Sequence, residues 1–215
     1  MSKKRGPSSA PEPADDGPWL DPDDAEPKLL LFATPGLGEL DAALATGAVA
    51  AVVADTRAMP GDDVQATMAA CRAHGVACLL RGDAAAARTA RADGVHLDDP
   101  DRVAAARKLL GEQALIGVSC SLSRHAAMVA GEAGADYVMF GALADRPTTD
   151  GELAEALAWW SELFVLPCVA AGRWDVDLAT AFVGVGADLL AMRLSDGGVA
   201  ALARTLRPAS PGEAR

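Results

Sequence analysis

Short apolar runs alternate with longer amphipathic segments from residue 28 almost to the end of the chain. The runs are rich in Val, Leu, Ile and Ala and are too short for helices, which is typical of buried strands. Several of the segments between them begin at Asp or Ser and end at Gly, as helices do. The pattern predicts strands over 29–33, 49–54, 76–80, 94–97, 116–120, 136–140, 167–171 and 189–193. It predicts helices over 38–45, 62–75, 83–91, 101–110, 123–132, 150–163, 175–186 and 198–206.

The connections from helix to strand are uniformly short. A motif recurs there, in which a small residue and Asp lead directly into a strand, as in Ala92-Asp93-Gly94-Val95 and Gly186-Ala187-Asp188-Leu189. Short helix-to-strand loops and longer strand-to-helix loops are required by a (β/α)8 barrel, because its ligands bind on the latter. An open doubly wound sheet is the alternative, but residues 33–38 do not form a G-x-G-x-x-G turn. We therefore predict an α/β fold, a (β/α)8 TIM barrel forming a single compact domain.

Composition sets the limits of this domain. Residues 1–27 are dominated by Pro, Asp, Ser and Gly, so a disordered N-terminal tail is expected, followed by a barrel over 28–207 and a C-terminal tail over 208–215. The net charge of −11 and the lack of a basic stripe argue against nucleic acid as a partner. No apolar run approaches the roughly 18 residues that span a bilayer, and no secretory signal follows the basic N-terminus. The four scattered cysteines indicate buried small side chains in a reducing cytoplasm.

In a barrel, the ligand-binding residues lie at the carboxyl ends of the strands. No lysine occupies such a position, so a Schiff-base aldolase is not expected. Carboxylates follow three consecutive strands, and they either converge on Mg²⁺ together with phosphate or cap helices: Asp55, Asp83, Asp98, Asp99 and Asp101. His96, inside a strand, is either part of the site or a packed core residue.

The last two strands suggest a phosphate site. Gly172 and the turn after residue 193 lie where many barrels bind phosphate through backbone N–H groups. Arg173 and Arg193 are placed to add charge-assisted hydrogen bonds, whereas Asp196 would repel the same anion.

Five segments, in order and with family-like spacing, resemble the thiamine-phosphate synthases and the related thiazole tautomerases. The segment 94–101 resembles their G-[VI]-H-[LV]-G-Q-x-D, and 116–119 resembles I-G-x-S. The segment 134–141 resembles G-A-D-Y-[VI]-x-x-G-P, 167–172 resembles P-V-V-A-I-G-G, and 186–188 resembles the final G-A-D. The resemblance implies a TIM barrel that joins hydroxymethylpyrimidine pyrophosphate to thiazole phosphate, with Mg²⁺ as cofactor.

Transfer of the family's roles, position by position, gives the candidate site. The resemblance makes Ser119 a pyrophosphate contact, Asp101 a Mg²⁺ ligand and Arg57 the arginine of the family's Q-x-R-x-K. The other metal aspartate is Gly82 by register, with Asp83 as a shifted substitute. The predicted catalytic residues are Ser119 and Arg57, and the predicted metal ligands Asp101 and Asp83. The predicted substrate- and phosphate-binding residues are Arg81, Arg146, Thr148, Thr149, Gly172, Arg173, Arg193 and Ser195.

The chain also departs from the family pattern. The lysines of Q-x-R-x-K and of the P-T-x-T-K loop are missing, and Arg173 replaces the second glycine of G-G. Two hypotheses stay open: a synthase in which arginines replace lysines, and a diverged or non-catalytic paralogue that binds a phosphorylated or heterocyclic ligand. A sugar-phosphate isomerase is less consistent, because the first strand ends in Ala33-Thr34 rather than in an acid. Under each hypothesis we expect a small phosphorylated ligand and a cytoplasmic protein, and a homo-oligomer is compatible with both.

Overall fold

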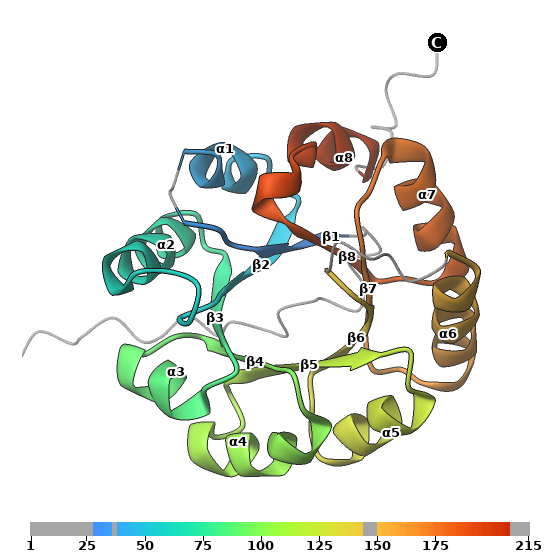
Figure 1. Ribbon diagram of the computed structural model, residues 1–215, viewed down its shortest axis with the longest axis horizontal. Coiled ribbons are helices and arrows are strands. Elements are labelled where there is room, and N and C mark those ends of the chain that lie inside the picture. Colours follow the sequence, from blue (N-terminus) through green and yellow to red (C-terminus); the bar gives the residue numbers. More distant parts are fainter. Residues whose placement is uncertain (1–27, 36–37, 144–149, 207–215) are drawn as a thin grey trace, which may run out of the picture.

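The computed structural model describes residues 28–35, 38–143 and 150–206. Eight parallel strands close into a barrel in sequence order, and Figure 1, viewed down the barrel, shows the helices as a ring outside them. The strands are β1 (Lys28–Phe32), β2 (Val49–Ala54), β3 (Ala77–Arg81), β4 (Gly94–Leu97), β5 (Leu115–Ser121), β6 (Tyr137–Gly141), β7 (Cys168–Ala171) and β8 (Leu189–Arg193). The predicted TIM barrel is confirmed, and the open sheet is excluded because β1 pairs with both β2 and β8.

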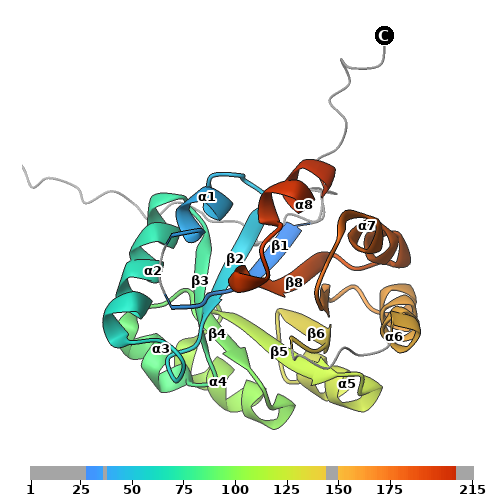
Figure 2. The same ribbon diagram turned by 45° about the horizontal axis from the view of Figure 1, so that its top comes forward.

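Each strand is followed by a helix that packs on the outside of the barrel, as the tilted view in Figure 2 shows. The α-helices are α1 (Leu40–Leu44), α2 (Gly61–Ala73), α3 (Ala84–Ala90), α4 (Val103–Leu110), α5 (Arg124–Glu132), α6 (Asp150–Leu163), α7 (Val176–Val185) and α8 (Val199–Leu206). Two short 3-10 helices, η1 (Pro100–Arg102) and η2 (Leu194–Asp196), follow β4 and β8. The expected tails over 1–27 and 208–215 lie outside the described residues. Within those residues, none of the helices is both long and apolar enough to cross a bilayer.

The strands separate two apolar regions because alternate side chains point to opposite faces. One face packs against the helices, and there all four cysteines lie buried and unbonded to one another, as predicted. The other face fills the barrel interior. The interior is lined by Leu30, Phe32, Ala51, Val53, Leu79, Tyr137, Met139, Val169, Ala171, Leu189 and Ala191.

The recurring Asp motif has a structural role at the amino ends of the strands. Asp93, Asp136 and Asp188 each precede an even-numbered strand, and each accepts a hydrogen bond from a backbone N–H of the preceding odd-numbered strand. The carboxylate distances are 2.7, 2.6 and 2.8 Å, to the N–H groups of Cys78, Ile116 and Cys168. Arg107 of α4 adds an ion pair of 2.6 Å to Asp136. These aspartates therefore tie strands together at the end of the barrel remote from the predicted site.

Candidate active site

Ser119 lies near the carboxyl end of β5 and is held by a buried histidine. His96 Nε2 lies 2.8 Å from Ser119 Oγ, and His96 Nδ1 lies 2.8 Å from the hydroxyl oxygen of Tyr137. Both rings are fully buried. Burial, together with a smaller effect of Arg81 and against the charge of Asp98, lowers the pKa of His96 from 6.5 to about 3. Burial and the nearby Asp136 raise the pKa of Tyr137. The cluster is therefore neutral at physiological pH.

Strand alternation directs Ser119 inward, since its partner in the register, Met139 of β6, lines the barrel interior. A register shift between Ser119 and Ser121 marks a bulge in the pairing of β5 with β6, and Ser121 has a φ of 50°. Bulges next to ligand sites commonly redirect a side chain, and left-handed backbone in a residue other than glycine carries strain. The helix that follows is capped by Ser123, whose Oγ accepts from the N–H of Ala126. Ser123 is therefore the N-cap of α5.

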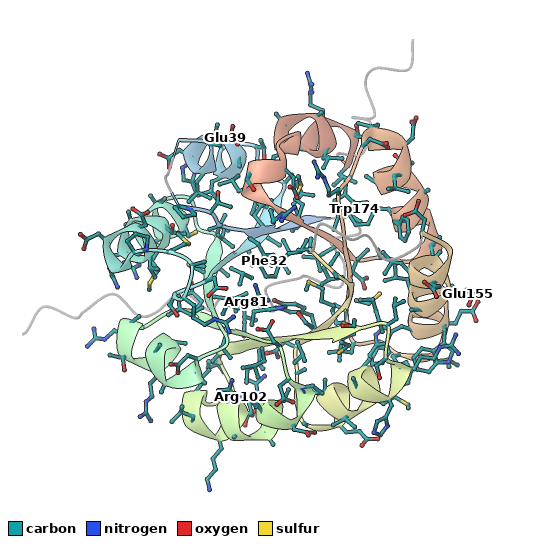
Figure 3. The ribbon with its side chains drawn as sticks, viewed as in Figure 1. Phe32, Glu39, Arg81, Arg102, Glu155 and Trp174 are labelled. Atoms are coloured by element: carbon teal, nitrogen blue, oxygen red, sulfur yellow. The ribbon has the colours of Figure 1, made fainter. Side chains whose placement is uncertain are left out.

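Arg57 and Arg81 form a closed network of ion pairs with Asp55 and Asp98 at the ends of β2, β3 and β4. Arg81 lies 2.9 Å from Asp98 and 3.4 Å from Asp55, while Arg57 lies 3.2 Å from Asp55 and 3.4 Å from Asp98. Burial alone would raise the pKa of Asp55, but the hydrogen bonds and charges of Arg57 and then Arg81 outweigh it and lower that pKa. Figure 3 shows Arg81 beside Phe32 inside the ring of strands. The two predicted cationic residues thus come together, but their charges are already matched.

The carboxylates that the sequence offered as metal ligands are mostly engaged elsewhere. Asp83 Oδ1 accepts from the N–H groups of Ala85 and Ala86 at the start of α3, and Asp99 Oδ1 accepts from the N–H of Asp101 at the start of η1. Helix capping therefore explains Asp83 and Asp99. Within the described ranges, no group of three or more His, Cys, Asp or Glu side chains could hold a metal ion.

Asp101 remains available for a metal. It is exposed in η1, and its carboxylate forms no hydrogen bond or ion pair with another described residue. Next to it, Arg102 donates to the carbonyl oxygen of Gly82 at 2.8 Å and joins the loops after β3 and β4. Mg²⁺ is commonly held by one or two carboxylates together with substrate phosphates. The residues present therefore suit a metal that arrives with a phosphorylated ligand, and not one held by protein groups alone.

The ends of β7 and β8 form a second region of the site. Arg173 is exposed and has no hydrogen-bonding or ionic partner among the described residues, whereas Arg193 lies 3.3 Å from Asp196. Ser195 is exposed in η2. Gly197 and Gly198 both have positive φ, 72° and 79°, and lead into α8. Consecutive backbone N–H groups in such turns and at helix N-termini bind phosphate.

Trp174 leaves little room for a side chain at Gly172. The indole N–H donates to the carbonyl oxygen of Ala191 at 2.9 Å, and a Cβ on Gly172 would lie 3.2 Å from the indole ring. Figure 3 shows Trp174 on the β7–β8 side of the molecule, whereas Glu155 projects from α6 away from the barrel. Trp174 therefore sets the path of the backbone from Gly172 to Arg173.

Some predicted residues cannot be placed and some contributors were missed. Arg146, Thr148 and Thr149 lie outside the described residues. The sequence did not reveal Tyr137, Arg102 and Trp174 as contributors, because each acts through a residue on another strand or loop. Their hydrogen bonds go to His96, Gly82 and Ala191, respectively. One signal was present: the chain has a single tyrosine, and it lies within an apolar strand.

The amino-acid sequence is similar to those of known proteins. The family model described as thiamine monophosphate synthase matches residues 35–195. The chain belongs to that family. A thiamine-phosphate synthase of Erythrobacter litoralis is 48% identical over 130 residues, which cover 58% of this chain and 61% of the relative. One of Rhodospirillum centenum is 40% identical over 161 residues, covering 71% of this chain and 78% of the relative.

A solved structure shows the same fold. Thiamine phosphate pyrophosphorylase from Pyrococcus furiosus superposes with a TM-score of 0.68 at 22% identity, over 83% of this chain and 95% of that one. The family match over residues 35–195 confirms the family resemblance drawn from the five sequence segments. The first of the relatives named above is matched over less than two thirds of its length, so the activity of this chain is argued from its own site.

Proposed function

We propose that this protein is a thiamine-phosphate synthase, which joins hydroxymethylpyrimidine pyrophosphate to thiazole phosphate with release of pyrophosphate. The observation that carries the proposal is Ser119, the residue that matches the family's pyrophosphate contact, held at 2.8 Å by the neutral imidazole of His96 near the carboxyl end of β5. Family membership over residues 35–195 supports the same substrate pair.

The reaction needs charge stabilisation at the leaving group. The bond between the pyrimidine methylene carbon and oxygen breaks, its electron pair leaves with pyrophosphate, and the thiazole nitrogen then supplies the pair for the new C–N bond. Ser119 donates a hydrogen bond to the leaving group, and Arg57 and Arg81 on neighbouring strands supply positive charge. A contact in an enclosed site, such as that of Ser119, is worth about 3 kcal/mol, or roughly 10² in rate, whereas the partly exposed arginines contribute less.

The mouth of the barrel is its rim at the carboxyl ends of the strands. In this proposal, the thiazole phosphate binds at the part of the mouth formed by the ends of β7 and β8. The guanidinium of Arg173, unpaired among the described residues, and the N–H of Gly198 at the start of α8 support this assignment, since an anion gains a cation and a backbone donor there. The N–H groups of Gly172 and Gly197 already donate to the carbonyl oxygens of Ala191 and Leu194. Arg193, already paired with Asp196, and Ser195 complete the proposed binding group. Arg146, Thr148 and Thr149 keep the role that the family resemblance implies.

Mg²⁺ is part of the proposal, with Asp101 as the residue that would hold it beside the pyrophosphate oxygens. Bound there, it would neutralise charge on the leaving group. Asp83 stays a proposed ligand through Oδ2, because its capping hydrogen bonds at 2.9 and 3.0 Å both go to Oδ1. A cytoplasmic location and a homo-oligomer stay predictions.

A direct assay tests the proposal. Purified protein is incubated with both substrates and Mg²⁺, and thiamine phosphate is measured by chromatography. We expect product, a loss of about 10² in rate with Ser119→Ala, and full activity with Ser123→Ala, a matched change at the neighbouring cap. Absence of product with correctly folded protein would refute the assignment.

A second function, a paralogue that binds a phosphorylated ligand without turnover, is favoured by one observation. Asp55 and Asp98 neutralise both arginines at the pyrophosphate end. Calorimetric titration with thiazole phosphate and with inorganic pyrophosphate distinguishes the two: the paralogue binds the first ligand without product formation in the assay above.

A further inference from the structure

The interior of the barrel contains a chain of three polar side chains, Tyr137, His96 and Ser119. The rest of the lining is apolar. Among the described residues, His96 and Tyr137 are the fully buried ionisable side chains in the interior. Since buried polar atoms must be hydrogen-bonded, both ring nitrogens need partners. They find them on the two following strands, Ser119 on β5 and Tyr137 on β6, each at 2.8 Å.

Gly117 makes this chain of contacts geometrically possible. In the strand register, Gly117 of β5 is paired with His96 on one side and with Tyr137 on the other. A Cβ on Gly117 would lie 1.9 Å from Tyr137 Cζ and 2.3 Å from the tyrosine oxygen. The missing side chain therefore leaves the space through which the tyrosine reaches across β5 to His96.

The ring of His96 is also held by its neighbours. Phe32 meets it edge-on at a centroid distance of 5.2 Å, and the Tyr137 ring stacks at 5.7 Å. With the ring fixed, the remaining freedom is which nitrogen carries the single proton of the neutral imidazole.

Only two proton arrangements satisfy the chain. In one, the Tyr137 hydroxyl donates to Nδ1, and Nε2–H donates to Ser119 Oγ, so the serine's own proton is free to point outward. In the other, Nδ1–H donates to the tyrosine oxygen and the serine gives its proton to Nε2. Pyrophosphate oxygens accept hydrogen bonds, so only the first arrangement lets Ser119 donate to them.

We propose that Tyr137 is a positioning residue that keeps the proton of His96 on Nε2 and thereby makes Ser119 a hydrogen-bond donor toward the ligand. The inference rests on the proposed function for the identity of that ligand. The tautomer of His96 and its dependence on Tyr137 concern the protein without ligand. Tyr137 does not touch the ligand in this scheme and acts through His96.

Nitrogen-15 NMR of the histidine rings tests the tautomer without substrate. The chain has three histidines, so the double variant H74Q/H125Q leaves the signals of His96 alone. We expect a pyrrole-like Nε2 and a pyridine-like Nδ1 between pH 6 and 8. In this background, Tyr137→Phe should give a mixture of tautomers, whereas Ser119→Ala should leave the tautomer unchanged. Met139→Leu, an apolar change at the next inward position of β6, is the matched control and should also leave it unchanged.

Binding of inorganic pyrophosphate supplies the second readout. Calorimetry should show affinity about tenfold weaker with Ser119→Ala, because one hydrogen bond to a charged group is lost. Tyr137→Phe should weaken binding less, about twofold for an even mixture of tautomers, and Met139→Leu should leave it unaltered. In the enzyme assay the tyrosine variant should lower kcat and leave KM for thiazole phosphate unchanged. Circular dichroism and thermal melting confirm that each variant is folded.

The outcomes are separable from those of the proposed function. A pyridine-like Nε2 in the wild-type chain, or a folded Tyr137→Phe variant with unaltered tautomer, would overturn the proposed role of Tyr137. The wild-type protein could also be inactive and yet show the expected tautomer, with that tautomer lost in Tyr137→Phe. This result would support the proposed role of Tyr137 and refute only the synthase assignment.

Discussion

The buried imidazole of His96 should make the protein measurably less stable in mild acid. In the unfolded chain this histidine has its ordinary pKa of 6.5, while burial lowers the pKa in the folded state to about 3. Between these values the unfolded state binds a proton that the folded state does not, so stability falls as the pH falls. The contribution of His96 is thus fully present above pH 6.5 and is lost progressively toward pH 3.

The magnitude follows from the two pKa values. Each pH unit inside this window costs about 1.4 kcal/mol, so lowering the pH from 7 to 5 removes about 2 kcal/mol of the free energy of unfolding. His96→Gln removes the titrating group and keeps a side chain that can reach both hydroxyl groups. The variant should be less stable than wild type at pH 7, and the gap should narrow by about 2 kcal/mol at pH 5.

Urea denaturation at pH 7, 6 and 5, followed by circular dichroism, measures this gap. His125→Gln, which removes an exposed imidazole at the start of α5, is the matched control for changes outside the barrel. A gap between wild type and His96→Gln that stays constant from pH 7 to 5 would show that His96 is not desolvated as the structure has it.

Three further predictions concern the mouth and the interior. Asp98→Asn leaves Arg81 without its 2.9 Å partner, so inorganic pyrophosphate should bind severalfold more tightly by calorimetry, and unchanged affinity would contradict the idea that this carboxylate competes with the ligand. Asp83→Ala should cost about 1 kcal/mol in urea denaturation, the usual value of a helix cap, and should leave the Mg²⁺ dependence of the assay unaltered if the residue is only a cap. Gly117→Ala should destabilise by about 3 kcal/mol or prevent folding, because its Cβ enters the Tyr137 ring, and the double variant with Tyr137→Leu should recover part of that loss in thermal melting.

The fold was predictable because its determinants are local and repeated. Apolar runs of strand length, helix stops at glycine and the Asp-containing turns before β4, β6 and β8 recur along the chain. The structure adds the reason for the aspartates: the carboxylate of Asp93 accepts from the Cys78 N–H, and Asp188 does the same for Cys168. Such contacts join neighbouring strands and depend only on the order of elements, so the pattern is visible in one sequence.

The site was predictable only in outline. The position of Arg57, Arg81, Asp55 and Asp98 at the carboxyl ends of strands indicated that they share one region, but for the acids the sequence predicted metal binding or helix capping, and the structure selects pairing of Asp55 and Asp98 with the arginines instead. That choice depends on distances across three strands, which spacing along the chain does not specify. His96 was ambiguous for a similar reason, since both of its partners lie on other strands.

The charge balance at the ends of β2, β3 and β4 has a consequence for the proposed binding of pyrophosphate. In the free protein, each guanidinium of Arg57 and Arg81 is shared between Asp55 and Asp98, so an incoming anion exchanges ion pairs instead of meeting unpaired cations. Arg57 and Arg81 remain partly exposed, so this exchange takes place close to water and each step is worth little. In this proposal, the affinity for the leaving group then depends on groups that have no countercharge in the free protein or that lie outside the network of Arg57, Arg81, Asp55 and Asp98. Near β4 and β5, Ser119, oriented from within the barrel, and Asp101, the proposed metal ligand, are two such groups.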